Sequence, residues 1–419
     1  MRLAAGACLL ALLALGLGGC GGGRRHPSPR PRSRYVDIYS DLPSHGPDAA
    51  RATEMRNGIA LALAQAGGRA GDFRVRYFAL DDSIAAARGA TLTRVLANAH
   101  RAAADTSAVY FIGPLGTDAL ETALPVLNQA DIAQVSPGST YVGLTSALPG
   151  AARDQPQAFE PSGQPTFVRL VPNDDVEAAA DLEAMHAAGC NRVALAYEQT
   201  LYGTGQAQTL EQLAPSYHVA LRSSPAPPPS DAAGYAQALR LASIRCFDYA
   251  GADVSDAVAL ADAIYQANRR ARLFVPHPLC APAFTDPRQG GIDPGAGAAL
   301  RCTMITAPLA SYPGGLAFAA DYAQRFPGSV PTAWALYGYE AMRLGLQAIA
   351  AAGARGNQRE AVRAALFAIH DLRSALGTFS VEPDGDTTLR SFGLYAVGAG
   401  GQPTFRTIVI PPKVLGDAY

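Results

Sequence analysis

The chain has 419 residues, of which 34 are basic and 35 acidic, and 49% are hydrophobic. A net charge of −1 excludes the strong basic excess that marks many nucleic-acid-binding domains. The hydrophobic content excludes a disordered chain. The length exceeds what one hydrophobic core usually holds, so we expect two domains.

The first twenty residues have the pattern of an export signal. Met1 and Arg2 precede an apolar run at residues 3–17, which is shorter than the roughly 20 residues that span a bilayer. Leu17 and two glycines then precede Cys20, which resembles the lipobox of bacterial lipoproteins. The resemblance implies a signal peptide at 1–19 and a lipid on the thiol of Cys20. Ordinary secretion with Cys20 as a bystander is the alternative.

A tether is expected at residues 20–34, because glycine and proline without an apolar period build no core. Its five arginines suit anionic lipid headgroups, each adding about 1 kcal/mol near the surface. Solvated charge that keeps the tether open is the simpler interpretation. We therefore expect an extracytoplasmic protein, lipid-anchored to the outer face of the cell membrane.

Strand and helix patterns alternate from the tether onward. The first set has expected strands at residues 35–40, 73–80, 108–112 and 132–135, and expected helices at 49–66, 85–104 and 118–129. Such alternation predicts an α/β fold, with a mainly parallel sheet that carries helices on both faces.

A loop rich in proline, glycine and alanine at residues 149–164 separates a second set of the same design. Its strands are expected at 166–171, 192–197, 217–221, 245–249, 271–275 and 301–306, and its helices at 175–188, 205–213, 233–242 and 255–268. We expect a second sheet of the same kind.

The last part of the chain predicts a return to the first sheet and then a hairpin. Helices at 331–352 and 358–369 suit the cover of the first sheet, and short strands at 376–381, 391–397 and 404–410 follow. The prediction is a two-lobed clamshell with a cleft between the lobes. Lobe 1 would comprise residues 35–164 and 308–377, and lobe 2 residues 165–307 and 378–419.

Four cysteines remain once Cys8 leaves with the signal and Cys20 serves as the anchor: Cys190, Cys246, Cys280 and Cys302. An even number in an exported chain favours disulfides, and four cysteines allow three pairings. We favour Cys280 with Cys302, a short loop whose closure is worth roughly 3 kcal/mol, which leaves Cys190 with Cys246. The spacing is not that of a zinc site, and we expect neither a metal nor a cofactor.

Short motifs at the expected strand ends occur in a particular order. They are Ser40–Pro47 (SDLPSHGP), Gly113–Thr117 (GPLGT), Ser136–Thr140 (SPGST) with Tyr141–Thr145 (YVGLT), Tyr202-Gly203-x-Gly205, Ser311–Gly315 (SYPGG) and Tyr337–Ala341 (YGYEA). Together they resemble the branched-chain amino acid substrate-binding proteins of ABC importers, over residues 35–410. The resemblance implies a type I periplasmic-binding fold, an amino acid or similar small ligand, and ABC permease subunits as partners.

In that family the first lobe grips the α-carboxylate and α-ammonium of the ligand. The resemblance places the carboxylate-binding hydroxyl at Thr117, where a helix N-terminus also favours an anion; a helix cap without a ligand role is the alternative. Gly138, Ser139 and Thr140 carry over as backbone and hydroxyl contacts to both groups. His45 matches a region of aromatic contact, although a lone histidine in a polar loop is equally a surface residue.

From the second lobe, Tyr202 matches a tyrosine that closes over the ligand, and Ala250 lies in a loop expected to line the cleft. His277 is a departure, because the family has an acid there that pairs with the ligand ammonium. A neutral histidine could accept a hydrogen bond, whereas a protonated one would repel an ammonium. Asp253 or Asp256 could replace the acid, or could cap the next helix.

Other functions are weaker. The chain contains none of the H-E-x-x-H, G-x-S-x-G or P-loop motifs, and its seven histidines are scattered, so we expect no enzyme. The alternatives within the fold are a sensor for an amide or small acid that signals to a partner protein, and a degenerate receptor that binds no ligand.

Overall fold

The computed structural model describes residues 35–84, 89–398 and 400–418. Residues 34–419 form one compact unit. The expected lipidation site Cys20 and the tether through Arg34 lie outside the described residues. Within the described ranges, no helix combines the length and the apolar character needed to cross a membrane.

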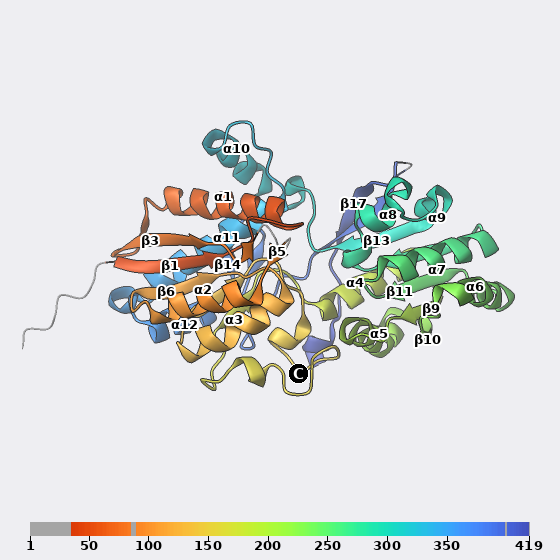
Figure 1. Ribbon diagram of the computed structural model, residues 1–419, viewed down its shortest axis with the longest axis horizontal. Coiled ribbons are helices and arrows are strands. Elements are labelled where there is room, and N and C mark those ends of the chain that lie inside the picture. Colours follow the sequence, from red (N-terminus) through yellow and green to blue (C-terminus); the bar gives the residue numbers. More distant parts are fainter. Residues whose placement is uncertain (1–34, 85–88, 399, 419) are drawn as a thin grey trace, which may run out of the picture. The chain divides into compact units, whose positions relative to one another are not determined.

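The first lobe is built on a sheet to which the described residues contribute six strands, in the order β2-β3-β1-β6-β7-β8 (Figure 1). All neighbouring strands are parallel except β2 and β3. The strands are β1 (Tyr35–Asp41), β2 (Arg69–Ala70), β3 (Phe73–Leu80), β6 (Ala108–Ile112), β7 (Ala133–Ser136) and β8 (Phe167–Arg169).

Helices cover both faces of this sheet. On one face lie α1 (Ala49–Gln65), α11 (Ala333–Ala351) and α12 (Arg359–Phe367), and on the other α2 (Leu92–Ala104) and α3 (Thr117–Gln129). The return of the chain to cover the first sheet is thus confirmed. Helix α10 (Gly315–Arg325), which was not expected, packs beside α1 and α11.

The second lobe has a sheet of seven strands in the described part of the chain, ordered β10-β9-β11-β12-β13-β16-β17. The first five are parallel, and β16 and β17 are antiparallel, as the expected hairpin requires. The strands are β9 (Arg192–Tyr197), β10 (Ala220–Pro225), β11 (Cys246–Ala250), β12 (Arg272–Val275), β13 (Leu300–Met304), β16 (Phe392–Val397) and β17 (Pro403–Val409).

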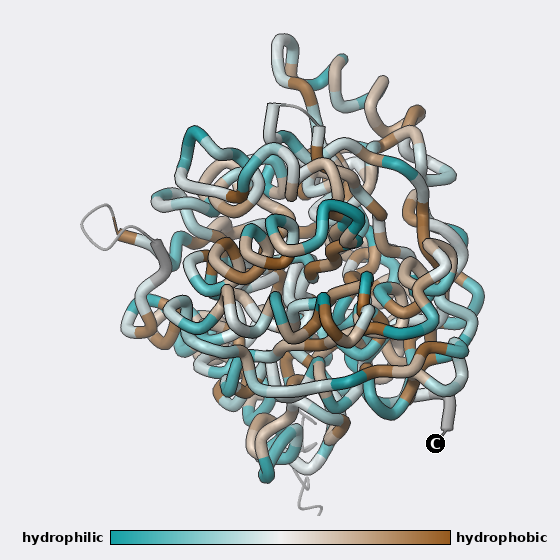
Figure 2. Tube along the Cα trace, turned by 90° about the vertical axis from the view of Figure 1, so that its right-hand side faces the viewer, coloured by the Kyte–Doolittle hydropathy of each residue, from teal (hydrophilic) through white to brown (hydrophobic). Residues whose placement is uncertain are grey.

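One face of the second sheet carries α4 (Asp174–Ala187) and α5 (Leu201–Leu213). The other carries α6 (Ala232–Leu241), α7 (Val254–Ala267), α8 (Pro282–Thr285) and α9 (Pro294–Ala299). In Figure 2 hydrophobic and hydrophilic segments alternate along the helices, as expected where each helix buries one face. Two small hairpins, β4 (Ser83–Ile84) with β5 (Gly89–Ala90) and β14 (Leu372–Arg373) with β15 (Thr378–Phe379), complete the elements.

The sheets correct two of the expected lobe boundaries. Strand β8 pairs with β7, so the segment at 167–169 belongs to the first lobe and not to the second. Strand β15 pairs with β14, and Val381 donates its N–H to Ile369, so the chain enters the second lobe only after this region. Both segments are short and lie next to a connection between the two lobes. At such a place the hydrophobic pattern alone does not show which of the two sheets a strand joins.

Two helix starts also differ from expectation. The helix expected from residue 85 begins at Leu92, after the β4–β5 hairpin. The alanine-rich sequence favours a helix, but strand pairing in the hairpin overrides this local propensity. The helix expected from residue 205 begins at Leu201, because the hydroxyl of Thr200 accepts the N–H of Gly203 at 3.0 Å and caps it. Tyr202 therefore lies in the first turn of α5.

Both expected disulfides are present. Cys190 is joined to Cys246 and Cys280 to Cys302. The first ties the segment before β9 to the start of β11, and the second ties the segment after β12 to β13. The first bond therefore lies at the start of its two strands, and the second lies beyond the carboxyl end of β12.

Candidate ligand-binding site

Two hydroxyls meet at the start of α3 in the first lobe. The Oγ1 of Thr117 lies 3.3 Å from the Oγ of Ser139, which follows β7. The N-cap of α3 is Gly116, so Thr117 is the first helical residue and the cap-only interpretation is wrong. The helix N-terminus leaves backbone N–H groups unpaired, which makes this a suitable place for an anion.

The hydroxyl of Ser136 holds the turn that carries Gly138 and Ser139. The sequence did not single out Ser136 as a ligand contact. The backbone N–H groups of Gly138 and Ser139 each lie 3.3 Å from the Oγ of Ser136. That hydroxyl donates in turn to the carbonyl of Pro114 at 3.3 Å. The backbone N–H groups of this turn, one of which was expected to contact a ligand carboxylate, are therefore directed to a serine. The hydroxyls of Thr117 and Ser139 remain as polar groups of this wall.

An aromatic and a cationic side chain lie over the same turn. A Cβ at Gly138 would be 3.8 Å from the Trp334 ring, an ordinary van der Waals contact, so the indole lies directly over this turn. The guanidinium of Arg51 lies 5.3 Å from the centre of that ring and pairs with Asp48 at 2.8 Å. A cation over an indole face is favourable. The Nε of Arg51 is buried and has no hydrogen-bond partner within the described residues.

The second lobe centres on Glu177, a fully buried carboxylate in the first turns of α4. One oxygen accepts the backbone N–H of His277 at 2.7 Å and the hydroxyl of Thr303 at 3.0 Å. The other accepts the ring of His277 at 2.8 Å, the hydroxyl of Tyr202 at 3.2 Å and the amide of Gln206 at 3.2 Å. Five donors therefore converge on one carboxylate.

Glu177 and His277 shift each other's pKa towards the charged forms. Burial pushes the pKa of Glu177 up, but the charge and hydrogen bonds of His277 outweigh it and keep the pKa below its usual value. Burial pushes the pKa of His277 down, and the Glu177 carboxylate outweighs that and raises it. Each partner therefore favours the charged form of the other, and the ion pair that they form when both are charged is the kind of pairing that makes two buried charges tolerable.

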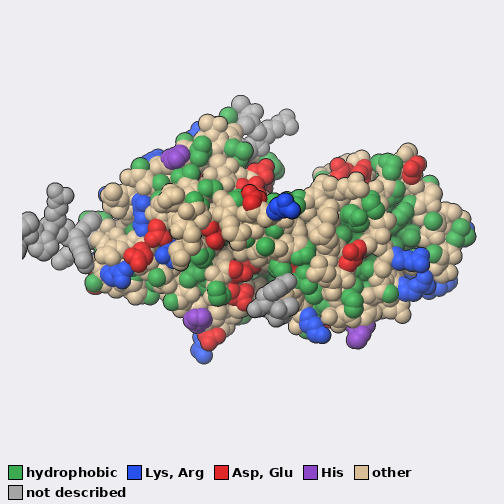
Figure 3. Space-filling model, turned by 90° about the horizontal axis from the view of Figure 1, so that it is seen from below, with side chains coloured by type: hydrophobic (Ala, Val, Ile, Leu, Met, Phe, Trp, Pro, Cys, Tyr) green, Lys and Arg blue, Asp and Glu red, His purple; other side chains and the backbone are tan. Residues whose placement is uncertain are grey.

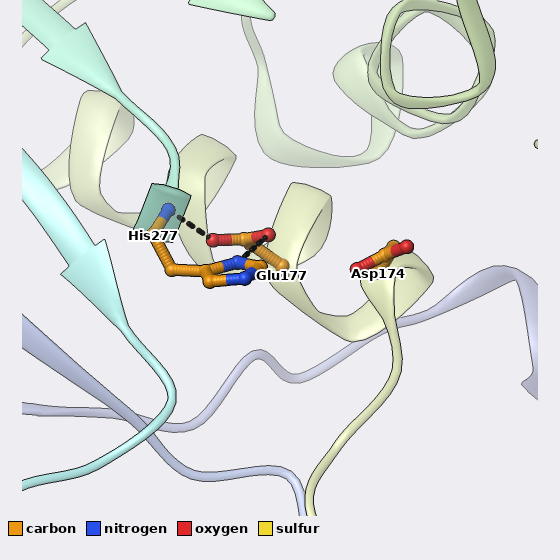
Figure 4. A group of neighbouring side chains, drawn as sticks. All are labelled: Asp174, Glu177 and His277. Atoms are coloured by element: carbon orange, nitrogen blue, oxygen red, sulfur yellow. Dashed lines mark hydrogen bonds and ion pairs between the residues drawn. The ribbon is translucent and has the colours of Figure 1, made fainter. Parts of the chain in front are cut away.

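Three more acids surround this pair. Asp174 lies on α4 ahead of Glu177, separated from the bonded pair in Figure 4, and burial with repulsion from Glu177 raises its pKa to about 7. Burial raises the pKa of Asp248 to about 8 and that of Asp181 well above its usual range. The Oδ1 atoms of Asp174 and Asp248 are buried without a hydrogen-bond partner among the described residues.

Asp174, Glu177 and His277 each offer one ligand atom, all within 4.8 Å of one another, so the set could in principle hold a metal. Both oxygens of Glu177 already accept hydrogen bonds, including one from a backbone N–H that cannot turn away. A metal would have to displace these donors, and we assign none to the cluster.

The two glycines after Tyr202 serve close packing. A Cβ at Gly203 would lie 2.6 Å from the carbonyl of Glu198 and 2.9 Å from that of Ala250, and one at Gly205 would lie 2.3 Å from the Cα of Gly150. Gly150 belongs to the loop after β7, so this contact joins the lobes. The Ala250 carbonyl accepts the N–H of Glu198 at 3.0 Å, which makes Ala250 part of the packing beneath Tyr202.

The lobes leave a small cavity at this contact. Tyr141 and Gly150 line it from the first lobe, and Asp174, Tyr202 and Gln206 from the second. Its volume is about 10 Å³, which is room for one water molecule and not for an amino acid. The Oδ1 of Asp174 and the Oε1 of Gln206, two buried acceptors without partners among the described residues, belong to side chains that line it.

Some predicted residues lie apart from these two walls. The ring of His45 is 48% exposed and lies 3.3 Å from Ser83 and 3.9 Å from Asp81, and neither of these residues belongs to the two walls. Asp253 caps α7 by accepting the N–H of Asp256 at 2.9 Å, so the capping alternative holds for this pair. The backbone of Thr140 accepts the N–H of Asp174 at 2.9 Å and thereby links the first lobe to the start of α4.

A model of the periplasmic binding protein family matches residues 42–402. The chain belongs to the periplasmic binding protein family. A comparison with curated protein sequences finds no match.

Solved structures of this family share the fold. A substrate-binding protein from Desulfitobacterium hafniense in complex with leucine superposes with a TM-score of 0.69 at 17% identity, over 89% of this chain and 100% of the other. A leucine-binding protein from Thermotoga maritima gives 0.64 at 19% identity, over 90% and 99%. A solute-binding protein from Rhodopseudomonas palustris in complex with 3,4-dihydroxybenzoic acid gives 0.63 at 15% identity, over 92% and 100%. The type I periplasmic-binding fold with two lobes is thereby confirmed.

Asp174, Glu177, Arg51 and Trp334 are site residues that the sequence did not reveal. Glu177 lies within a run of acids at the start of a helix, which is the ordinary place for solvated acids. Trp334 is the chain's single tryptophan, and that rarity was the one available signal.

Proposed function

We propose that this periplasmic binding protein is the lipid-anchored receptor of an ABC importer, and that it captures a small carboxylate between its lobes. The observation that carries the proposal is the pair of hydroxyls of Thr117 and Ser139, 3.3 Å apart at the N-terminus of α3. Hydroxyls and free backbone N–H groups at a helix start favour a carboxylate. Leucine and 3,4-dihydroxybenzoic acid, the ligands of two structural relatives, share that group.

An amino acid is the ligand class that we place first. Its ammonium requires an acceptor, and the carboxylate of Glu177 is occupied by five donors. Asp174 is the nearest alternative, since it is 92% buried and its Oδ1 has no hydrogen-bond partner among the described residues. In this proposal Asp174 takes the role that the family gives to the acid at position 277.

A second ligand class is an aromatic acid, and the residues that favour it are Trp334 and Arg51. An indole that already stacks with a guanidinium offers a flat, electron-rich surface for an aromatic ring. Arg51 suits an anion that brings no ammonium, and so does His277, whose pKa is raised by the Glu177 carboxylate. For such a ligand Asp174 would be dispensable.

Capture requires the lobes to separate, since the cavity at their contact holds about one water molecule. A ligand that binds first to Thr117 and Ser139 is enclosed when the second lobe rotates and Tyr202 approaches. The ligand stabilises the closed state only as far as it binds that state better than the open one. The permease then recognises the closed receptor.

The test is a thermal-shift and calorimetry screen of the chain with Cys20→Ala against leucine, isoleucine, valine, benzoate and 3,4-dihydroxybenzoate. Thr117→Ala should weaken the binding of every ligand that binds the parent chain. Thr122→Ala, in the second turn of the same helix, should not. Asp174→Asn should weaken binding of amino acids only, with Asp231→Asn as the control. A full panel without any binding would overturn the proposal.

The anchor is tested separately. Wild-type chain expressed in a bacterium should fractionate with the membrane, and Cys20→Ala should be released while it still binds its ligand. A tether keeps the receptor near the permease and raises its effective concentration there. Membrane association of Cys20→Ala equal to wild type would contradict the lipid anchor.

A further inference from the structure

A basic hollow lies at the start of three neighbouring strands of the second sheet. It has a volume of about 530 Å³, and four arginines are among the residues that line it. Arg192 and Arg272 are the first residues of β9 and β12, Arg245 immediately precedes β11, and Arg270 lies two residues before β12. In Figure 3 basic side chains gather over the second lobe, towards the right-hand end of the view.

The charge of the hollow is not balanced by neighbouring acids. Among the described residues that line it none is acidic, and none of the four arginines forms an ion pair there. Burial and the nearby charges of Arg406 and Arg272 also lower the pKa of Arg301 on β13, so the positive potential extends along this sheet edge. All four side chains are exposed, which leaves their N–H groups accessible.

Helix ends account for only part of this charge. Helices α4, α6 and α7 end just before the three lining segments, and each C-terminus carries roughly half a negative charge. Arg272 uses one N–H on the carbonyl of Ala188 at the end of α4. Three helix ends together supply roughly one and a half negative charges against four guanidinium groups. The excess remains for another anion.

The walls of the hollow are held together covalently. The disulfide between Cys190 and Cys246 joins the segment of Arg192 to that of Arg245, and the sheet pairs Cys246 with Arg272. The four guanidinium groups therefore project from a rigid frame. Planar guanidinium groups bind phosphate oxygens in pairs, and preorganisation lowers the entropy lost on binding.

We propose that this hollow is a binding site for phosphate groups, separate from the ligand cleft and independent of the proposed transport function. The group it accepts carries two or more negative charges, as pyrophosphate or a cluster of phospholipid headgroups does. Arg192 and Arg245 supply most of the binding, because the disulfide holds their two segments together and neither side chain has another partner in the described structure. Arg272 is partly committed to Ala188.

The experiment uses the full chain with Cys20→Ala, so that no lipid anchor contributes. Calorimetry with sodium pyrophosphate in low salt compares the parent with Arg192→Gln/Arg245→Gln. The matched control is Arg74→Gln/Arg153→Gln, which removes the same charge from exposed positions outside the hollow. The parent and the control should bind pyrophosphate, and the hollow variant should bind at least tenfold more weakly. Thermal unfolding should show all three folded.

A second arm identifies the source of the phosphate. Co-sedimentation with phosphatidylglycerol vesicles, against phosphatidylcholine vesicles, should be reduced in the hollow variant only if lipid headgroups reach the arginines. Binding of pyrophosphate without vesicle binding assigns the site to a soluble anion. Equal pyrophosphate affinity in the two double variants, or none in the parent, would overturn the proposal.

Discussion

The Nδ1 of His277 lies 2.8 Å from the Oε2 of Glu177, although 100 residues separate the two in the chain. Glu177 comes from the first turns of α4 and His277 from the segment after β12, on neighbouring parts of the second lobe. The segment after β12 therefore brings a histidine bonded to a buried acid, and not a free carboxylate, to this part of the second lobe.

Glu177→Gln should lower the pKa of His277, because the carboxylate charge that raises it is removed. It should also lower the free energy of unfolding by about 1–3 kcal/mol, since one amide oxygen cannot accept from five donors. Histidine NMR titration and urea unfolding measure the two effects. An unaltered pKa at His277 would contradict the ion pair.

Amino acid binding should release protons near neutral pH. Burial and Glu177 raise the pKa of Asp174 to about 7, so about half of the molecules carry this proton at pH 7. A ligand ammonium favours the ionised form and lowers that pKa. Calorimetry in buffers of different ionisation enthalpy should show release of about half a proton per ligand, and none in Asp174→Asn. Equal release in the variant would place the proton elsewhere.

Stability should fall as pH rises from 5 to 8. Asp248 has a pKa of about 8 in the folded protein and about 4 when unfolded, so the folded state retains a proton that the unfolded state has lost. Each such group lowers the free energy of unfolding by about 1 kcal/mol per pH unit in this window. Asp248→Asn should reduce the slope in urea titrations.

The slope should not vanish in Asp248→Asn, because burial also raises the pKa of Asp41 to about 8. Asp154→Asn, at an exposed position, is the control and should leave the slope unchanged. A parallel pH dependence in Asp248→Asn and wild type would show that Asp248 is ionised in the folded state.

Gly205→Ala should weaken ligand binding without unfolding the receptor. The new Cβ would lie 2.3 Å from the Cα of Gly150 in the other lobe, so it opposes the closed arrangement and leaves an open one unaffected. We expect affinity to fall by at least tenfold and the radius of gyration in small-angle scattering to rise. Gly234→Ala on α6, where a Cβ meets nothing within 4 Å, is the matched control. Wild-type affinity in Gly205→Ala would refute closure through this contact.

Arg169→Gln should be strongly destabilising, because Arg169 ties the lobe crossovers together. Its side chain is 1% exposed, pairs with Asp386 at 2.6 Å and donates to the carbonyl of Tyr141 at 2.7 Å. Removal of one partner from a buried ion pair costs about 3–5 kcal/mol. Arg355→Gln breaks an exposed pair with Glu360 at 3.7 Å and should cost less than about 1 kcal/mol. Similar urea midpoints for the two variants would contradict this role.

Much of the fold was predictable from local pattern. Alternating strands and helices predicted two parallel sheets, and the return of the last helices to the first sheet and both disulfides were also expected. The errors lie at crossovers, where β8 and β15 join the first lobe. A three-residue strand such as Phe167–Arg169 has too little pattern of its own to show which sheet it extends.

The candidate site was predictable in its first lobe and incomplete in its second. Thr117 and Ser139 follow consecutive parallel strands of one sheet. The order of the motifs therefore predicted that the two residues lie close together. The partner of His277 could not be found in this way, because Glu177 reaches it from a helix whose rotation depends on packing against the second sheet.

The sequence by itself determined most of the order of elements and the family, because these depend on residue type and short-range spacing, and it favoured the disulfide pairing that the structure then showed. Only the tertiary structure decided that the unusual histidine is held by a buried acid, that one oxygen of Asp174 has no hydrogen-bond partner among the described residues, and that four arginines share one hollow. Such groups lie far apart along the chain. Their charges interact only after folding has excluded water and brought them within a few ångströms of one another.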